Sequence, residues 1–78
     1  MMAPEPLIAP SARRHNVEDA DMLHAYRNAS DAWNLDESLV MLVGSDRSGV
    51  LLEIGLVRSE DGTPVIVHAM KARPKFLR

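Results

Sequence analysis

The sequence predicts an α+β fold in which one or two N-terminal helices pack on one face of an antiparallel β-meander. Three observations support this prediction. Apolar residues recur at helical spacing over residues 17–28, whereas from residue 32 onward the apolar period changes to two. Glycine-terminated turn sequences at 46–49 and 59–62 separate the apolar runs. With 78 residues, the chain has room for a single thin core, which excludes a two-domain enzyme.

The first elements are predicted from proline and capping signals. Residues 1–10 are a proline-rich N-terminal segment, in which Leu7–Ala9 can form a short edge strand that Pro10 ends. Ser11 can cap a short helical turn. Asn16 can cap the main helix, with Asp19 three residues later in the place of a capping-box acid. We therefore expect a helix over 17–28.

The strands follow in order at 32–35, 39–44, 50–58 and 64–70. Because helices precede them and no other layer is available, the helices must cover one face of the sheet. A single domain is expected over residues 11–75, with residues 76–78 as a C-terminal tail.

The turn lengths predict which side chains meet across the sheet. If both turns are four-residue loops, Val43 faces Leu52 and Met41 faces Ile54, which gives one wholly apolar core face. On the opposite face, Glu53 then lies across from His68. A two-residue loop makes the same pair diagonal neighbours, whereas a three-residue loop needs a bulge. A carboxylate beside an imidazole is either a cross-strand ion pair or an acid–base pair in which the carboxylate fixes the imidazole tautomer.

The same opposite face also carries a patch that is too apolar to remain in water. Such patches on small domains mark interfaces, either with a second copy or with a dedicated protein partner. The expected partner interface comprises Leu42, Leu51, Ile66 and Met70.

Composition narrows the chemistry further. Cysteine is absent, which excludes disulfides and thiolate chemistry, and the three histidines share no ligand spacing, so we expect no metal and no cofactor. No apolar run approaches the ~20 residues of a membrane span, and a cytoplasmic protein is expected. Residues 16–66 carry ten acids and three bases, a balance of −7, whereas residues 67–78 carry +4. A basic end can contact a phosphate backbone.

Several strings along residues 11–75 resemble the BrnT-like toxins of the RelE/ParE-like superfamily. The entry Arg14-His15-Asn16-Val17 is similar to the family's "(R/K)-H-G-V", with Asn16 in place of glycine. Residues 44–53 resemble its "G-x-(D/S)-x-x-G-R-L-L" hairpin, and residues 65–73 resemble its closing strand, "I-I-S-A-R-x-A". In that strand His68 stands where a serine is common, and Met70 where an arginine is common.

The resemblance implies a bacterial toxin with a RelE-like fold that cleaves RNA without a metal and is neutralised by a cognate antitoxin, often one that binds DNA. Such cleavage needs a base, an acid and a cation for the phosphate. His68 would be base or acid, with Glu53 as its orienter. Phosphate contacts are expected from Arg47, Lys71, Arg73, Arg14 and His15.

Two alternatives stay open at this point. The chain could be a catalytically inert member of the same fold that binds a protein partner, which Met70 and the acidic middle of the chain favour. It could also be an unrelated small homo-oligomeric sheet protein.

Overall fold

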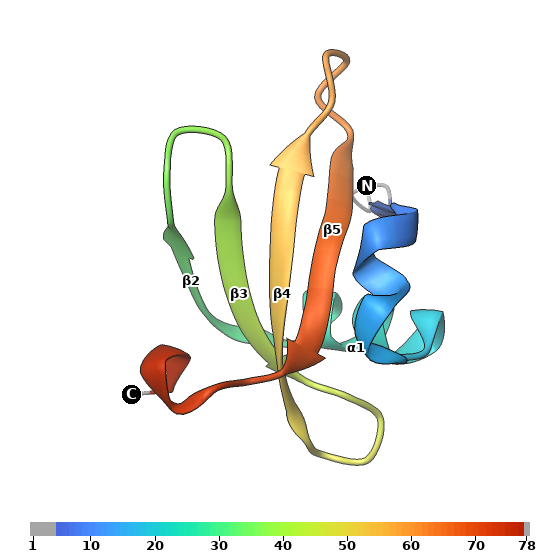
Figure 1. Cartoon of the computed structure of the whole chain (residues 1–78), viewed down its shortest axis with the longest axis vertical. Coiled ribbons are helices and arrows are strands. Elements are labelled where there is room, and N and C mark those ends of the chain that lie inside the picture. Colours follow the sequence, from blue (N-terminus) through green and yellow to red (C-terminus); the bar gives the residue numbers. More distant parts are fainter. Residues whose placement is uncertain (1–4, 78) are drawn as a thin grey trace.

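A five-stranded mixed sheet with helices packed against it makes up the computed structural model, which describes residues 5–77 (Figure 1). The strand order is β1-β5-β4-β3-β2; β1 runs parallel to β5, and every other neighbouring pair is antiparallel. The elements are β1 (Leu7–Ile8), η1 (Pro10–His15), α1 (Asp19–Arg27), β2 (Ala29–Asn34), β3 (Val40–Ser45), β4 (Leu51–Arg58), β5 (Pro64–Lys71) and η2 (Pro74–Phe76). The predicted α+β class is therefore confirmed, as is the short edge strand.

The helical segments differ from expectation at their ends. Asn16 does not cap the main helix; it adopts a left-handed conformation (φ 61°) that ends the 3₁₀ helix η1, and α1 begins only after Glu18. Asp19 forms an ion pair with Arg13 at 2.8 Å, which ties the two helical segments together. The hydroxyl of Ser11 does not cap η1 either, because it donates a hydrogen bond to the backbone carbonyl of Val67.

The core lies between α1, η1 and the inner face of the sheet. Its buried side chains are Ala12, Met22, Ala25, Leu42, Leu52, Ile54, Leu56, Ile66 and Ala69. Contact between helix and sheet is close at Gly44, where a Cβ would lie 2.1 Å from the carbonyl oxygen of Ala25. Glycine at this position of β3 is thus what allows α1 to lie directly on the strand.

The predicted register of the β3–β4 hairpin is wrong by one residue. Its loop has five residues, because the Asp46 carboxylate accepts hydrogen bonds from the backbone N–H groups of Ser48 and Val50, and the backbone N–H of Asp46 donates to the Val50 carbonyl. Glu53 therefore faces Val43, and Gly55 faces Met41. A one-residue slip moves every side chain of a strand to the other face, so Leu42 is in the core and Met41 and Val43 are on the outer face.

The β4–β5 hairpin combines a five-residue loop with a bulge. Arg58 pairs with Pro64 and Leu56 with Ile66, but Gly55 pairs with His68, which leaves Val67 as the extra residue of β5. Because of this bulge, Ile66 and Ala69 both point into the core although they are three residues apart.

Most of the C-terminal end is an ordered part of the fold. Instead of an irregular tail after Pro74, η2 crosses one end of the sheet from β5 toward β2 (Figure 1). Residues 1–4 and 78, which belong to the expected N-terminal segment and tail, lie outside the described residues. Within residues 5–77, no helix has the length and apolar character needed to cross a membrane.

Candidate active site

A buried carboxylate on the outer face of the sheet is the centre of the site. The side chain of Glu53, in the middle of β4, is fully buried and is the only buried charged residue within residues 5–77. Its Oε2 lies 2.8 Å from Nε2 of His68 on β5 and 2.7 Å from Nη2 of Arg73. Its Oε1 accepts hydrogen bonds from Nε of Arg73 at 3.0 Å and from the backbone N–H of the same residue at 2.9 Å.

The predicted contact between Glu53 and His68 is confirmed, although the register that produces it is different. Glu53 pairs with Met70 and His68 with Gly55, so the two side chains are diagonal neighbours on one face. Gly55 provides the space for this approach, because a Cβ there would lie 3.0 Å from Cβ of His68.

The ionisation of Glu53 follows from its partners. Burial alone would raise the pKa of this carboxyl, but the hydrogen bonds from Arg73 and His68 outweigh burial and lower the pKa to about 2. The hydrogen bonds to Glu53 also raise the pKa of Arg73 above its ordinary value. The carboxylate is therefore charged at neutral pH, and it accepts the Nε2–H of His68, which leaves Nδ1 as the nitrogen that can take up a proton.

A second imidazole and an exposed cation complete the cluster. The ring of His15, at the end of η1, meets the ring of His68 edge-on with centroids 5.8 Å apart. The His68 side chain is 29% exposed and that of Arg73 is 44% exposed, so both reach solvent while Glu53 does not. The cluster thus contains two imidazoles and a guanidinium that can take part in chemistry. The buried Glu53 carboxylate fixes the positions of the His68 ring and of the Arg73 guanidinium.

Three of the expected phosphate contacts lie outside this cluster. Arg47 binds Asp21 through Nε at 2.8 Å and Glu18 through Nη2 at 2.6 Å, and hydrogen bonds to Asp21 and then Glu18 raise its pKa. Its guanidinium thus holds the β3–β4 turn against the start of α1. Lys71 pairs with Leu52, a core residue, and therefore lies on the opposite face of the sheet from His68, where it lines a hollow together with His15. Arg14 is exposed on η1, and no contact places it in the cluster.

The expected interface patch does not exist as a surface. Leu42 belongs to the core because the longer β3–β4 loop shifts the register of β3. Ile66 belongs to the core because of the bulge in β5. Leu51 is 42% exposed and Met70 is half-buried, and both remain on the outer face.

Residues at the end of η2 were missed as partners of this site. Phe76 packs against Trp33 of β2 with ring centroids 5.5 Å apart, and Arg73 and Lys75 lie over the Phe76 ring. No local pattern could have indicated this, because the rings are separated by more than half of the chain and meet only when η2 crosses the sheet. The basic-aromatic run after residue 72 is the one signal that was available.

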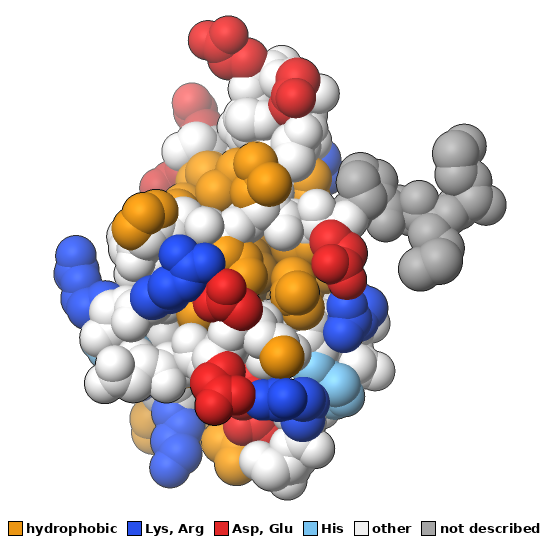
Figure 2. Space-filling model, turned by 90° about the vertical axis from the view of Figure 1, so that its right-hand side faces the viewer, with side chains coloured by type: hydrophobic (Ala, Val, Ile, Leu, Met, Phe, Trp, Pro, Cys, Tyr) orange, Lys and Arg blue, Asp and Glu red, His pale blue; other side chains and the backbone are white. Residues whose placement is uncertain are grey.

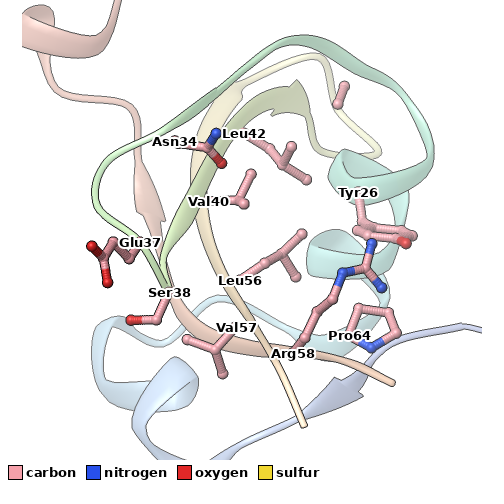
Figure 3. A pocket seen from close by; sticks show the side chains of 11 residues that line it. Tyr26, Asn34, Glu37, Ser38, Val40, Leu42, Leu56, Val57, Arg58 and Pro64 are labelled. Carbon is pink, nitrogen blue, oxygen red and sulfur yellow. The ribbon is translucent and has the colours of Figure 1, made fainter. Parts of the chain in front are cut away.

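An apolar hollow lies on the other face of the sheet. Because α1 covers only part of the inner face, a cavity of about 740 Å³ remains between its C-terminal end and the sheet. Figure 3 shows Val40, Leu42 and Leu56 directed from the sheet into this cavity, with the ring of Tyr26 opposite them. Polar side chains at its rim include Arg58 and Glu37. We call this cavity the inner groove.

Comparison with protein families, curated proteins and solved structures gives no match for this chain.

Proposed function

We propose that this chain is the toxin of a type II toxin–antitoxin pair and that it cleaves mRNA in the bacterial cytoplasm without a metal. The observation that carries the proposal is the partly exposed His68 imidazole, which is held by a buried carboxylate and lies beside a second imidazole. A RelE-like fold, with helices on one face of a meander, is consistent with this arrangement.

The residues divide the reaction among them. Nδ1 of His68 takes the proton of the ribose 2′-hydroxyl as its oxygen attacks the adjacent phosphorus, and the bond from phosphorus to the 5′-oxygen breaks. His15, when protonated, donates a proton to that leaving oxygen. The products are a 2′,3′-cyclic phosphate and a 5′-hydroxyl. Arg73 uses only Nε and Nη2 for Glu53, so its Nη1 hydrogens can contact the phosphate.

Cleavage of an mRNA by the purified chain in the presence of a chelator tests the proposal. We expect His68→Ala to lower the rate by 10²–10⁴-fold, about the contribution of one general acid or base. His15→Ala should produce a loss of similar kind. His24→Gln is the matched control, because His24 lies on α1 and bonds the Ser45 carbonyl at 2.7 Å. No cleavage by the unaltered chain, or full cleavage by His68→Ala, would contradict the assignment.

A second candidate, the inert binding module, is favoured by one observation. Arg47 and Arg73, two of the cations expected to hold phosphate, are both already paired with carboxylates. In this reading, the Glu53 cluster only fastens η2 to the sheet. The growth of cells that produce the folded chain distinguishes the two, because only the toxin slows it.

The cognate antitoxin is proposed to cover the inner groove. The groove is lined by apolar side chains that include Val40, Leu42 and Leu56. On the face of the molecule shown in Figure 2, hydrophobic side chains gather below an acidic tip, and acidic and basic side chains are interspersed over the lower half. Burying apolar surface such as that of Val40 and Tyr26 stabilises a complex by about 25 cal/mol per Å². The −7 balance of residues 16–66 favours a basic partner, which a DNA-binding antitoxin would be.

A further inference from the structure

We propose that Trp33 and Phe76 form a stacking subsite for one base of a single-stranded RNA, directly beside the Glu53 cluster. This inference rests on the proposed function, because it specifies how the same site would hold its substrate.

The two rings form a joint aromatic surface. Their centroids are 5.5 Å apart and their planes are inclined by 35°. Trp33 comes from β2 at one edge of the sheet, and Phe76 comes from η2, which crosses to that strand (Figure 1). Both residues are half-buried. The base would contact the part of this aromatic surface that solvent reaches.

Cations lie where the phosphate next to a stacked base would need them. Nζ of Lys75 is 5.0 Å from the centroid of the Phe76 ring, and Cζ of Arg73 is 5.3 Å from it. Sites for single-stranded nucleic acids combine these two features, an aromatic platform for the base and positive charge for the backbone.

Arg73 links this platform to the proposed catalytic pair. Its guanidinium contacts the Phe76 ring and also donates to Glu53, which in turn accepts from His68. A base stacked on the rings would thus place its neighbouring phosphate near the guanidinium. The substrate must be single-stranded, because in a duplex the faces of the bases are already covered.

Fluorescence offers a direct test, since Trp33 is the only tryptophan of the chain. A short single-stranded RNA is titrated into the His68→Ala protein, which prevents cleavage during the measurement. We expect the Trp33 emission to change on binding. Phe76→Leu should weaken binding by about 5- to 150-fold, the range expected for one stacked base, whereas Phe76→Tyr should bind as tightly as the parent. Tyr26→Leu is the matched control, because Tyr26 lines the inner groove.

A strand of the same length that lacks its bases separates stacking from charge. Weaker binding of this strand supports the subsite, and this comparison holds even if Phe76→Leu fails to fold. Equal affinity for both strands, or unchanged affinity in a folded Phe76→Leu protein, overturns it. RNA binding that depends on Phe76 without any cleavage would retain the subsite and refute the nuclease. RNA cleavage that is unchanged in Phe76→Leu would support the nuclease and refute the subsite.

Discussion

A single residue, Glu53, holds together the side chains on the outer face of the sheet. A charged group is rarely buried unless it is paired, and here every polar contact of the carboxylate comes from His68 and Arg73. The carboxylate thereby fastens the segment after β5 to the middle of β4. Structure and proposed catalysis depend on the same group, so variants of it need a stability measurement beside the activity.

Removing the guanidinium should destabilise the fold. Arg73→Ala leaves the buried carboxylate of Glu53 with His68 and one backbone N–H, and an unpaired buried charge costs about 3 kcal/mol. Urea unfolding measures the loss. The double variant Glu53→Leu/Arg73→Ala should recover part of it, because no buried charge is then left unpaired. A double variant that is less stable than Arg73→Ala would show that Glu53 stabilises the fold even without Arg73, which would contradict this account.

The acid dependence of stability should reveal the same carboxylate. Its pKa is about 2 in the folded chain against an ordinary value of 4.5. A lowered pKa contributes stability that is fully present above about pH 4.5 and is lost as the pH falls toward 2. The stability difference between the unaltered chain and Glu53→Gln should therefore stay constant from about pH 7 down to about pH 4.5 and shrink as the pH falls from there toward 2. Asp61, whose pKa is also lowered to about 2, is unchanged in both proteins and cancels. A difference that stays constant below about pH 4.5 as well would contradict the assignment.

Among the elements, the helix–sheet contact depends on one small residue. Gly44→Ala should destabilise the chain by about 1–3 kcal/mol, because its Cβ would overlap the Ala25 carbonyl and force α1 away from β3. Gly49→Ala is the control for a change of glycine without crowding, since nothing lies within 4 Å of its Cβ and the cost there comes from its positive φ of 91°. Chemical denaturation measures the stability of both variants, and circular dichroism checks that each variant keeps its helix. An unaffected Gly44→Ala would mean that α1 can shift at no cost.

The existence of the elements was predictable from the sequence, whereas their register was not. Gly49 and Gly62 both adopt positive φ in the turns where the sequence placed them. The loop lengths depend on side chains such as Asp46 and Asp61, each of which accepts backbone hydrogen bonds and extends its loop to five residues. The apolar period does not show these hydrogen bonds between side chains and the backbone. One extra residue in the β3–β4 loop moved every side chain of β3 to the opposite face from the predicted one.

The site was predictable only in part for the same reason. Glu53 and His68 meet because the five-residue loop and the bulge at Val67 together leave them diagonal, an outcome that a slip without a bulge would not give. Arg47 was expected to reach the site, but acids at the start of α1 were closer partners. Trp33 and Phe76 depend on a long-range crossing that no local pattern encodes.

For the whole molecule, the two faces of the sheet have separate proposed roles, the outer one in chemistry and the inner groove in neutralisation. This division predicts that neutralisation by the antitoxin can be lost while toxicity is kept. Val40→Asp places a charge in the groove, where Val40 is half-buried and points into the cavity (Figure 3). Cells that produce this variant should still grow slowly, because the outer face is intact. Production of the antitoxin from the neighbouring reading frame should no longer relieve the effect.

Leu51→Asp provides the contrasting variant for that experiment. Leu51 is 42% exposed on the outer face and lies outside the groove. The antitoxin should therefore restore the growth of cells that produce Leu51→Asp as fully as it does for the unaltered chain. A surface substitution of this kind changes stability by no more than about 0.5 kcal/mol. Relief that survives Val40→Asp and fails in Leu51→Asp would place the partner on the outer face, over the Glu53 cluster. The antitoxin would then act by blocking the site directly, and the inner groove would have no part in neutralisation.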